Sequence, residues 1–154
     1  MALLIFGKTV CPLCDRVIKS GESTHSFPAF VVNEKDPCFI FSDCAFHEEC
    51  VRQHKLGAYA TQRVEGWVSK VGPGKRKCVV CQNEVTNPDD YLLVEHLSDD
   101  ANDPLRAFNY THLHKSCLPK WKSRDYFVGL VNKVIASGRW QGGYLAHLLN
   151  EIGQ

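Results

Sequence analysis

The stretch from Asn109 to Trp121, NYTHLHKSCLPKW, decides the fold of the chain. It holds His112, His114 and Cys117 and ends on a Trp. His114 and Cys117 are three residues apart, a spacing that places two side chains on one face of a helix. Two ligands at the start of a helix do not complete a tetrahedral metal site, so two more must come from elsewhere in the chain.

The missing ligands are found because the chain repeats. A shift of 67 residues places the sequence on itself without a gap. Apolar positions coincide under this shift, and each half reads C-x2-C, then 32 residues, then H-x2-C. The coinciding ligand-type pairs are Cys11 with Cys78, Cys14 with Cys81, His47 with His114, and Cys50 with Cys117.

This pattern predicts two metal sites. One C-x2-C alone also fits a redox motif, but two of them followed by H-x2-C at the same distance favour metal binding. Closed sets of thiolates and imidazole are typical of structural zinc. Buried reduced cysteines or disulfides are the alternative, and no secretory signal supports an oxidising compartment. We predict two zinc ions per chain, bound by Cys11, Cys14, His47 and Cys50 and by Cys78, Cys81, His114 and Cys117.

Four further ligand-type residues have no counterpart in the repeat. Cys38 falls on Leu105, Cys44 on Thr111, His54 on Trp121, and His112 on Ala45. We therefore expect them in packing or surface roles. The order Cys44-x2-His47-x2-Cys50 keeps Cys44 as an alternative ligand.

The composition argues against nucleic-acid-binding and membrane proteins. The formal charge is +1, from 18 basic and 17 acidic side chains. Six ligand thiolates and two zinc ions would change it to −1, far from the basic balance of a nucleic-acid binder. A basic run at Lys70, Lys75, Arg76 and Lys77 keeps nucleic-acid binding as a second alternative, although a solvated linker explains it better. No segment is long and apolar enough for a membrane span, and the expected location is cytoplasmic without membrane contact.

The predicted fold class is α+β, with two zinc units and an extra helix. In each half, strands flank the C-x2-C turn and residues 38–41 or 105–108 form a third strand. Helix caps at Ser42 or Asp43, and at Asn109 or Thr111, precede the H-x2-C ligands. Apolar stripes predict helices after each ligand pair and at the C-terminus. The expected boundaries are 1–71 for the first unit with its helix, 72–77 for the linker, 78–137 for the second unit, and 138–154 for the C-terminal amphipathic helix.

A C-x2-C turn on a hairpin, paired with two ligands at the start of a helix, resembles the treble-clef zinc finger. Both halves fit, so the resemblance covers nearly the whole chain except the last helix. The second half, with CVVC and HKSCLPKW, is also similar to the first zinc site of RING-type ubiquitin ligases. That resemblance implies that Val80 and Trp121 contact a ubiquitin-conjugating enzyme, with Pro119 less secure. The first half carries Leu13 but has His54 in place of the Trp.

The chain departs from the RING pattern because no Cys follows Cys117, so a second interleaved site cannot form. No Ser-His-Asp set, phosphate loop or carboxylate pair indicates catalysis. The sequence predicts a zinc-stabilised protein-interaction module or adaptor. The alternative is a RING-like ligase scaffold that recruits a conjugating enzyme through Val80 and Trp121. In that reading Trp121 is at least partly exposed beside the second zinc site, whereas the competing reading places it in the core under the final helix.

Overall fold

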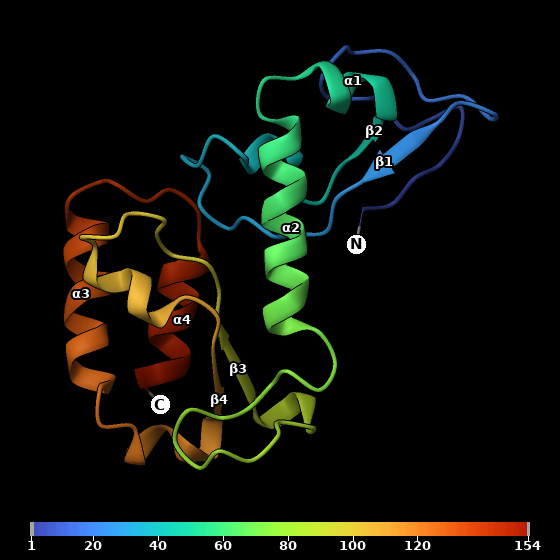
Figure 1. Ribbon diagram of the computed structural model, residues 1–154. Helices are drawn as coiled ribbons and strands as arrows, with labels where there is room; N and C mark the ends of the chain where they lie inside the picture. Colours follow the sequence, from blue (N-terminus) through green and yellow to red (C-terminus); the bar gives the residue numbers. More distant parts are fainter. Residues whose placement is uncertain (1, 154) are drawn as a thin grey trace. The chain divides into compact units, whose positions relative to one another are not determined.

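The computed structural model describes residues 2–153, and the chain folds into two compact units. The first comprises residues up to 32 and 36–67, and the second comprises 33–35 and 68 onward. Figure 1 labels the helices and strands used below.

The first unit is built on a two-stranded antiparallel hairpin, β1 (Thr24–Ser26) and β2 (Ala45–His47). A six-residue helix, α1 (Glu48–Gln53), follows β2 directly. After a turn comes α2 (Gly57–Val71), whose last turn is grouped with the second unit. Leu56, which directly precedes α2, and Ala60, Val64 and Trp67 of the helix pack on the first core, as the apolar stripe predicted.

The entry to α2 requires a glycine. Gly57 donates its backbone N–H to the His54 carbonyl at 2.8 Å. A Cβ at this position would lie 1.9 Å from the Val51 carbonyl oxygen. No side chain fits so close an approach of backbone to backbone, which explains a residue that otherwise weakens helices.

The core of the first unit is aromatic. Phe27, Phe30, Phe41 and Phe46 are all buried, with ring centroids of neighbouring pairs 5.4 to 5.8 Å apart. Aromatic rings at such separations attract each other beyond the effect of the area they bury. Buried Cys38 and partly buried Cys44 pack in or against this cluster, as predicted for cysteines outside the repeat.

The second unit has the hairpin β3 (Tyr91–Val94) and β4 (Thr111–His114), followed by a 3-10 helix at Lys115–Lys120. Two helices complete it, α3 (Arg124–Ala136) and α4 (Tyr144–Gly153), which lie side by side in Figure 1. Leu145, Leu148 and Ile152 of α4 are buried against this mainly aliphatic core. The C-terminal helix therefore covers the core of its own unit.

The repeat seen in the sequence is also a repeat of backbone structure. Thr24 pairs with His47, and Tyr91 pairs with His114, so the two hairpins share one register. Isolated bridges join Val10 to Val17 and Lys77 to Glu84, again 67 residues apart. In the part of the chain that the structure describes, the four non-glycine residues with positive φ also form repeat pairs, Asp15 with Gln82 and Asp43 with Tyr110. Such conformations are uncommon for non-glycine residues, so their recurrence marks two copies of one structural unit.

Several predicted local elements are wrong. Residues 39–41 and 104–108 form 3-10 helices where strands were predicted, because Asp36 and Asp103 each accept a hydrogen bond from the backbone N–H two residues on and start a helical turn. The strands flanking each C-x2-C turn reduce to single bridges. The residues that precede the ligand helices are His47 and His114 themselves, not the predicted caps. Among residues 2–153, no helix is long and apolar enough to cross a membrane.

Candidate metal centres

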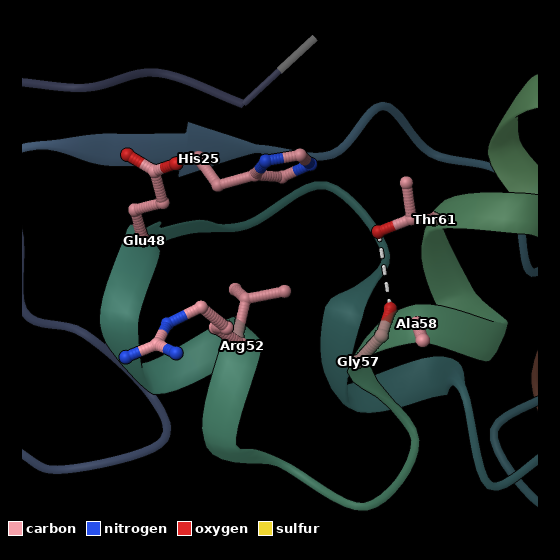
Figure 2. Close-up of a pocket in the computed structure, with 7 residues that line it drawn as sticks. His25, Glu48, Arg52, Gly57, Ala58 and Thr61 are labelled. Carbon is pink, nitrogen blue, oxygen red and sulfur yellow. Dashed lines mark hydrogen bonds between the residues drawn. The ribbon is translucent and has the colours of Figure 1, made fainter.

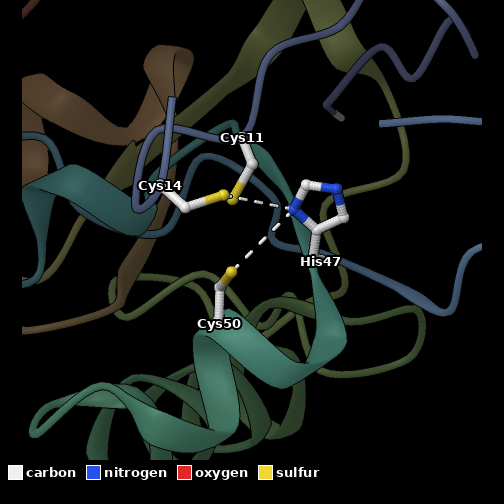
Figure 3. A group of neighbouring side chains, drawn as sticks. All are labelled: Cys11, Cys14, His47 and Cys50. Carbon is white, nitrogen blue, oxygen red and sulfur yellow. Dashed lines mark hydrogen bonds between the residues drawn. The ribbon is translucent and has the colours of Figure 1, made fainter. Parts of the chain in front are cut away.

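Each unit brings together four ligand-type side chains from the same three places. The C-x2-C turn contributes two sulfurs, the end of the second strand contributes the His, and the first turn of the following helix contributes the last Cys. Figure 3 shows the first cluster, where four side chains converge on one point. The clusters are Cys11, Cys14, His47 and Cys50, and Cys78, Cys81, His114 and Cys117.

The spacing of the ligand atoms fits a tetrahedral site. All four atoms of each cluster lie within 4.8 Å of one another. The His47 Nδ1 atom lies 3.4 Å from the Cys14 sulfur and 3.8 Å from the Cys50 sulfur, and His114 Nδ1 lies 3.4 Å from the Cys81 sulfur. Bond lengths of about 2.3 Å to sulfur and about 2.0 Å to nitrogen predict about 3.6 Å between such atoms around one ion. Each cluster could therefore hold one metal ion.

The pKa values of the ligand thiols also favour a bound cation in each cluster. A hydrogen bond with Arg16 lowers the pKa of Cys14 to about 6, whereas burial raises the pKa of Cys50 to about 11. Burial likewise raises the pKa of Cys117 to about 11. Three thiolates this close repel one another, so the least acidic sulfur keeps its proton unless a divalent cation replaces it.

The first centre has an acidic partner outside the ligand set. His47 Nε2, the ring nitrogen away from the sulfurs, lies 3.2 Å from the Glu22 carboxylate. This contact fixes the tautomer that leaves Nδ1 free to bind a metal. A hydrogen bond from the Lys19 backbone N–H, together with His47, lowers the pKa of Glu22 and keeps it ionised. Nothing in the sequence pattern identified Glu22, because its distance from His47 follows no ligand rule.

In the second centre the nearby carboxylate is bound differently. Asp90 accepts hydrogen bonds from the backbone N–H and the hydroxyl of Ser116, at 2.8 and 2.9 Å. These bonds, with a further contribution from His114, lower the pKa of Asp90. The carboxylate thus supports the start of the 3-10 helix that carries Cys117.

The residues outside the repeat lie outside both clusters. His112 is buried and joins the Tyr91 hydroxyl, 2.8 Å from Nδ1, to the Lys70 carbonyl, 3.0 Å from Nε2. His54 packs its ring edge against Phe41. Cys44 belongs to neither cluster, and burial raises its pKa, so it remains a protonated packing residue. The predicted packing roles are correct for these side chains.

The residues predicted to contact a partner lie around the second C-x2-C turn. Trp121 is only 8% exposed and packs on Phe108 and Phe127, so the expectation of a partly exposed Trp is wrong. The indole is buried because these two aromatic rings pack against it. The edge of Trp121 still borders a hollow of about 230 Å³. The other residues that line it are Val79, Val80, Lys120, Lys122 and Ser123. Pro119 is exposed, and Leu13, the first-half counterpart of Val80, is partly buried.

A further pocket lies at the start of α2 in the first unit. Its volume is about 260 Å³, and Figure 2 shows residues that line it, among them His25, Glu48 and Arg52. Thr61 donates its hydroxyl to the Gly57 carbonyl at 3.0 Å, and the Arg52 Nε atom lies 2.8 Å from the Glu49 carboxylate. The Thr61 and Arg52 side chains are therefore paired within the first unit.

The basic run between the halves has partly structural roles. Arg76 donates to the Val71 carbonyl at 3.2 Å, and its guanidinium lies 5.2 Å from the centre of the Tyr91 ring. Such a contact is a cation–π interaction. Arg76 therefore belongs to the structure of the second unit, which leaves fewer cations for a nucleic-acid surface.

No protein-family model, curated protein or solved structure matches the chain significantly. The metal assignment therefore rests on the geometry of the eight side chains and on the repeat that duplicates it.

Proposed function

We propose that the protein is a protein-interaction module held together by two structural zinc ions, each in a treble-clef-like unit. The observation that carries the proposal is the pair of Cys3His clusters built from equivalent positions. Thiolates and imidazole at tetrahedral spacing suit zinc, and four protein ligands leave no coordination position for a substrate or a water. A closed site of this kind serves structure, not catalysis.

The scaffold around each cluster supports the treble-clef assignment. A tight turn carries two ligands, a hairpin follows, and a helix that begins at the third ligand carries the fourth. Each unit is small, so much of its order depends on the metal. What remains for function is the surface that the metal holds rigid.

Affinity capture with the zinc-loaded full chain tests the proposal. We expect proteins that are enriched reproducibly over a zinc-loaded, unrelated treble-clef protein used as bait. Quantitative mass spectrometry provides the readout, with zinc content measured for both baits. Absence of any enriched protein would overturn the interaction-module proposal.

A second candidate function is a RING-like ligase scaffold. The hollow beside Val80 and Trp121 favours it, because that is where the family resemblance places a conjugating enzyme. Against it stand the burial of Trp121 and the lack of a second interleaved site in the second half.

The repeat offers a matched control for this candidate. Purified conjugating enzymes charged with ubiquitin are mixed with the protein, and the release of ubiquitin to free lysine is followed. A ligase scaffold accelerates release, and Val80→Glu returns it to the background rate. Leu13→Glu, at the equivalent position of the first half, leaves the acceleration intact. If no conjugating enzyme of a broad panel is accelerated, the ligase candidate is wrong.

A further inference from the structure

The outer face of the first C-x2-C turn is apolar where the fold does not require it. Val10 and Val17 face each other across the strand pair that enters and leaves the turn, and both are exposed. In the second unit the same bridge joins Lys77 and Glu84. Because the same backbone is built with a charged pair there, the two valines are not needed to form the turn.

More apolar side chains lie on the segment that leads into this turn. Ala2 and Leu4 pack on the core, while Leu3 and Ile5 point outward, as alternation along an extended chain predicts. Phe6 follows at a tight turn. We define the first-knuckle face as Leu3, Ile5, Phe6, Val10 and Val17, which are 38 to 77% exposed.

This face is held rigidly. The Ile5 N–H bonds the Thr9 hydroxyl at 2.8 Å, and the Ile5 carbonyl accepts from the backbone N–H groups of Lys8 and Thr9. Gly7, with φ +79°, donates to the Ile18 carbonyl at 2.8 Å and ties the turn to the opposite strand. Rigid apolar side chains lose little entropy on binding, so they are suited to an interface.

Cations border the same face. Lys8 precedes Val10 by two residues, Lys19 follows Val17 by two, and both are exposed. Arg16 adjoins Val17, although its guanidinium is hydrogen-bonded to the Cys14 sulfur. The nearby acids are Asp15 and Glu22, and Glu22 is already bound to His47. Lys8 and Lys19 are thus placed to meet carboxylates of a partner.

We propose that the first-knuckle face binds an acidic, amphipathic segment of another protein, with apolar side chains on the valine pair and carboxylates at Lys8 and Lys19. This inference rests on the proposed function as an interaction module and names the surface and the partner chemistry.

Two other occupants fit less well. Binding of a protein to an anionic bilayer is stabilised by about 1 kcal/mol for each basic residue near the surface. Here three cations lie beside two carboxylates, so the net attraction to such a bilayer is small. Apart from Leu3, the apolar side chains are about half covered, which suits a protein contact better than insertion into a bilayer. A symmetric dimer through this face would bring Lys8 and Lys19 of two copies together, which costs repulsion.

The test selects displayed random 16-residue peptides on the zinc-loaded full chain, and then measures their affinity for variants. We expect enriched peptides with carboxylates beside two or more apolar residues. The variant V10K/V17E carries the pair that the second unit already accommodates, and it should bind these peptides at least tenfold more weakly. K8E/K19E should weaken binding by at least tenfold and remove most of its salt dependence. Ile135→Lys, at an exposed isoleucine of α3 in the second unit, should leave affinity within twofold.

Each variant is first shown to bind two zinc ions with an unchanged thermal transition. If V10K/V17E fails this check, V10T/V17T replaces it, since Thr keeps the branched shape and exchanges one methyl group of each valine for a hydroxyl. The inference is overturned if no peptide is enriched, if enriched peptides lack carboxylates, or if they bind V10K/V17E as tightly as the wild type. Binding to vesicles of 30% phosphatidylserine in phosphatidylcholine, or self-association in sedimentation, overturns it too if V10K/V17E abolishes that behaviour.

The failure of this inference differs from failure of the proposed function. If V10K/V17E still captures every protein that the wild type captures from cells, the module stands and only the first-knuckle face is wrong. If the wild type captures none, the module itself is wrong.

Discussion

The two units place their metal ligands alike but differ in what surrounds them. In the first, the His ligand is held by Glu22, the core is a cluster of phenylalanines, and the knuckle bridge is Val10–Val17. In the second, the carboxylate Asp90 supports the ligand helix, Trp121 and two further helices fill the core, and the bridge is Lys77–Glu84. The two units therefore share the backbone that carries the ligands. Where equivalent positions hold different side chains, that backbone does not require either one.

Removal of the metal should unfold both units alike, because we expect each Cys3His cluster to supply much of the folding free energy of its unit. A structural zinc site contributes about 10–16 kcal/mol of apparent binding free energy near neutral pH. This exceeds the roughly 5–15 kcal/mol of stability of an ordinary domain. Full chelation should unfold both units, as followed by circular dichroism with the zinc content measured in parallel. Cys14→Ser and Cys81→Ser should each leave one zinc ion bound. A verified metal-free chain with an unchanged thermal transition would contradict the structural role.

Substitution by Ala at the equivalent positions 54 and 121 should lower the stability of the two units unequally. Trp121 is buried, so Trp121→Ala should lower the free energy of unfolding by about 3–5 kcal/mol. His54 occupies the same repeat position, where it packs on Phe41 and accepts a hydrogen bond from the Leu56 N–H at 3.1 Å, so His54→Ala should cost about 1–2 kcal/mol. Urea unfolding measures both. Equal losses would show that the indole does not act as a core residue.

Glu22 distinguishes the two metal centres. Partners that orient a His ligand commonly change metal affinity by about 10–100-fold when removed. Glu22→Ala, which removes the acceptor for His47 Nε2, should therefore weaken the first site by that range and speed zinc transfer from it to a competing chelator. The second site should stay unchanged and serves as the internal control. Identical transfer rates from both sites, before and after substitution, would mean that the Glu22 contact does not support the ligand.

The smallest expected effect concerns the Tyr91–His112 hydrogen bond, which the first unit lacks because Thr24 and Ala45 stand there. Tyr91→Phe should lower stability by about 0.5–1.5 kcal/mol near neutral pH. Burial raises the pKa of Tyr91 to about 12 from the usual 10.0, so the folded state favours the protonated phenol. Its contribution is then fully present below pH 10 and is lost as the pH rises from about 10 to 12.

Unfolding free energies of the wild type and Tyr91→Phe, measured from pH 8 to 12, test that hydrogen bond. The difference between the two proteins should shrink, or change sign, across the upper part of the range. A difference that stays constant to pH 12 would show that the phenol is not protected from ionisation in the folded chain.

The ligand clusters and long helices were predictable from the sequence because their signals are strong. Equal spacing of eight ligand-type residues identified both clusters, and apolar stripes identified α2, α3 and α4. The 3-10 helix at Phe39–Phe41 was missed because Asp36 accepts a hydrogen bond from the Cys38 N–H and starts a turn, which overrides the strand propensity of Phe39 and Ile40.

Other features depend on tertiary contacts that no spacing rule contains. The burial of Trp121 follows from Phe108 and Phe127, which approach it from other parts of the chain. The contact between Glu22 and His47 spans 25 residues and depends on the turn before β1. The exposure of Val10 and Val17 is visible only once the bridge between them is known.

The order of the ligands along the chain has a consequence for synthesis. His47 and Cys50 lie between the two C-x2-C turns, and fewer residues separate Cys50 from Cys78 than separate Cys14 from His47. Loop-closure entropy alone would therefore allow His47 and Cys50 to join Cys78 and Cys81 in a crossed site. A ribosome releases Cys11 through Cys50 before the second turn emerges, so the first site can close around its metal with no competitor accessible. Refolding of the complete chain from denaturant lacks that order, and it should yield crossed, partly metallated species that synthesis avoids.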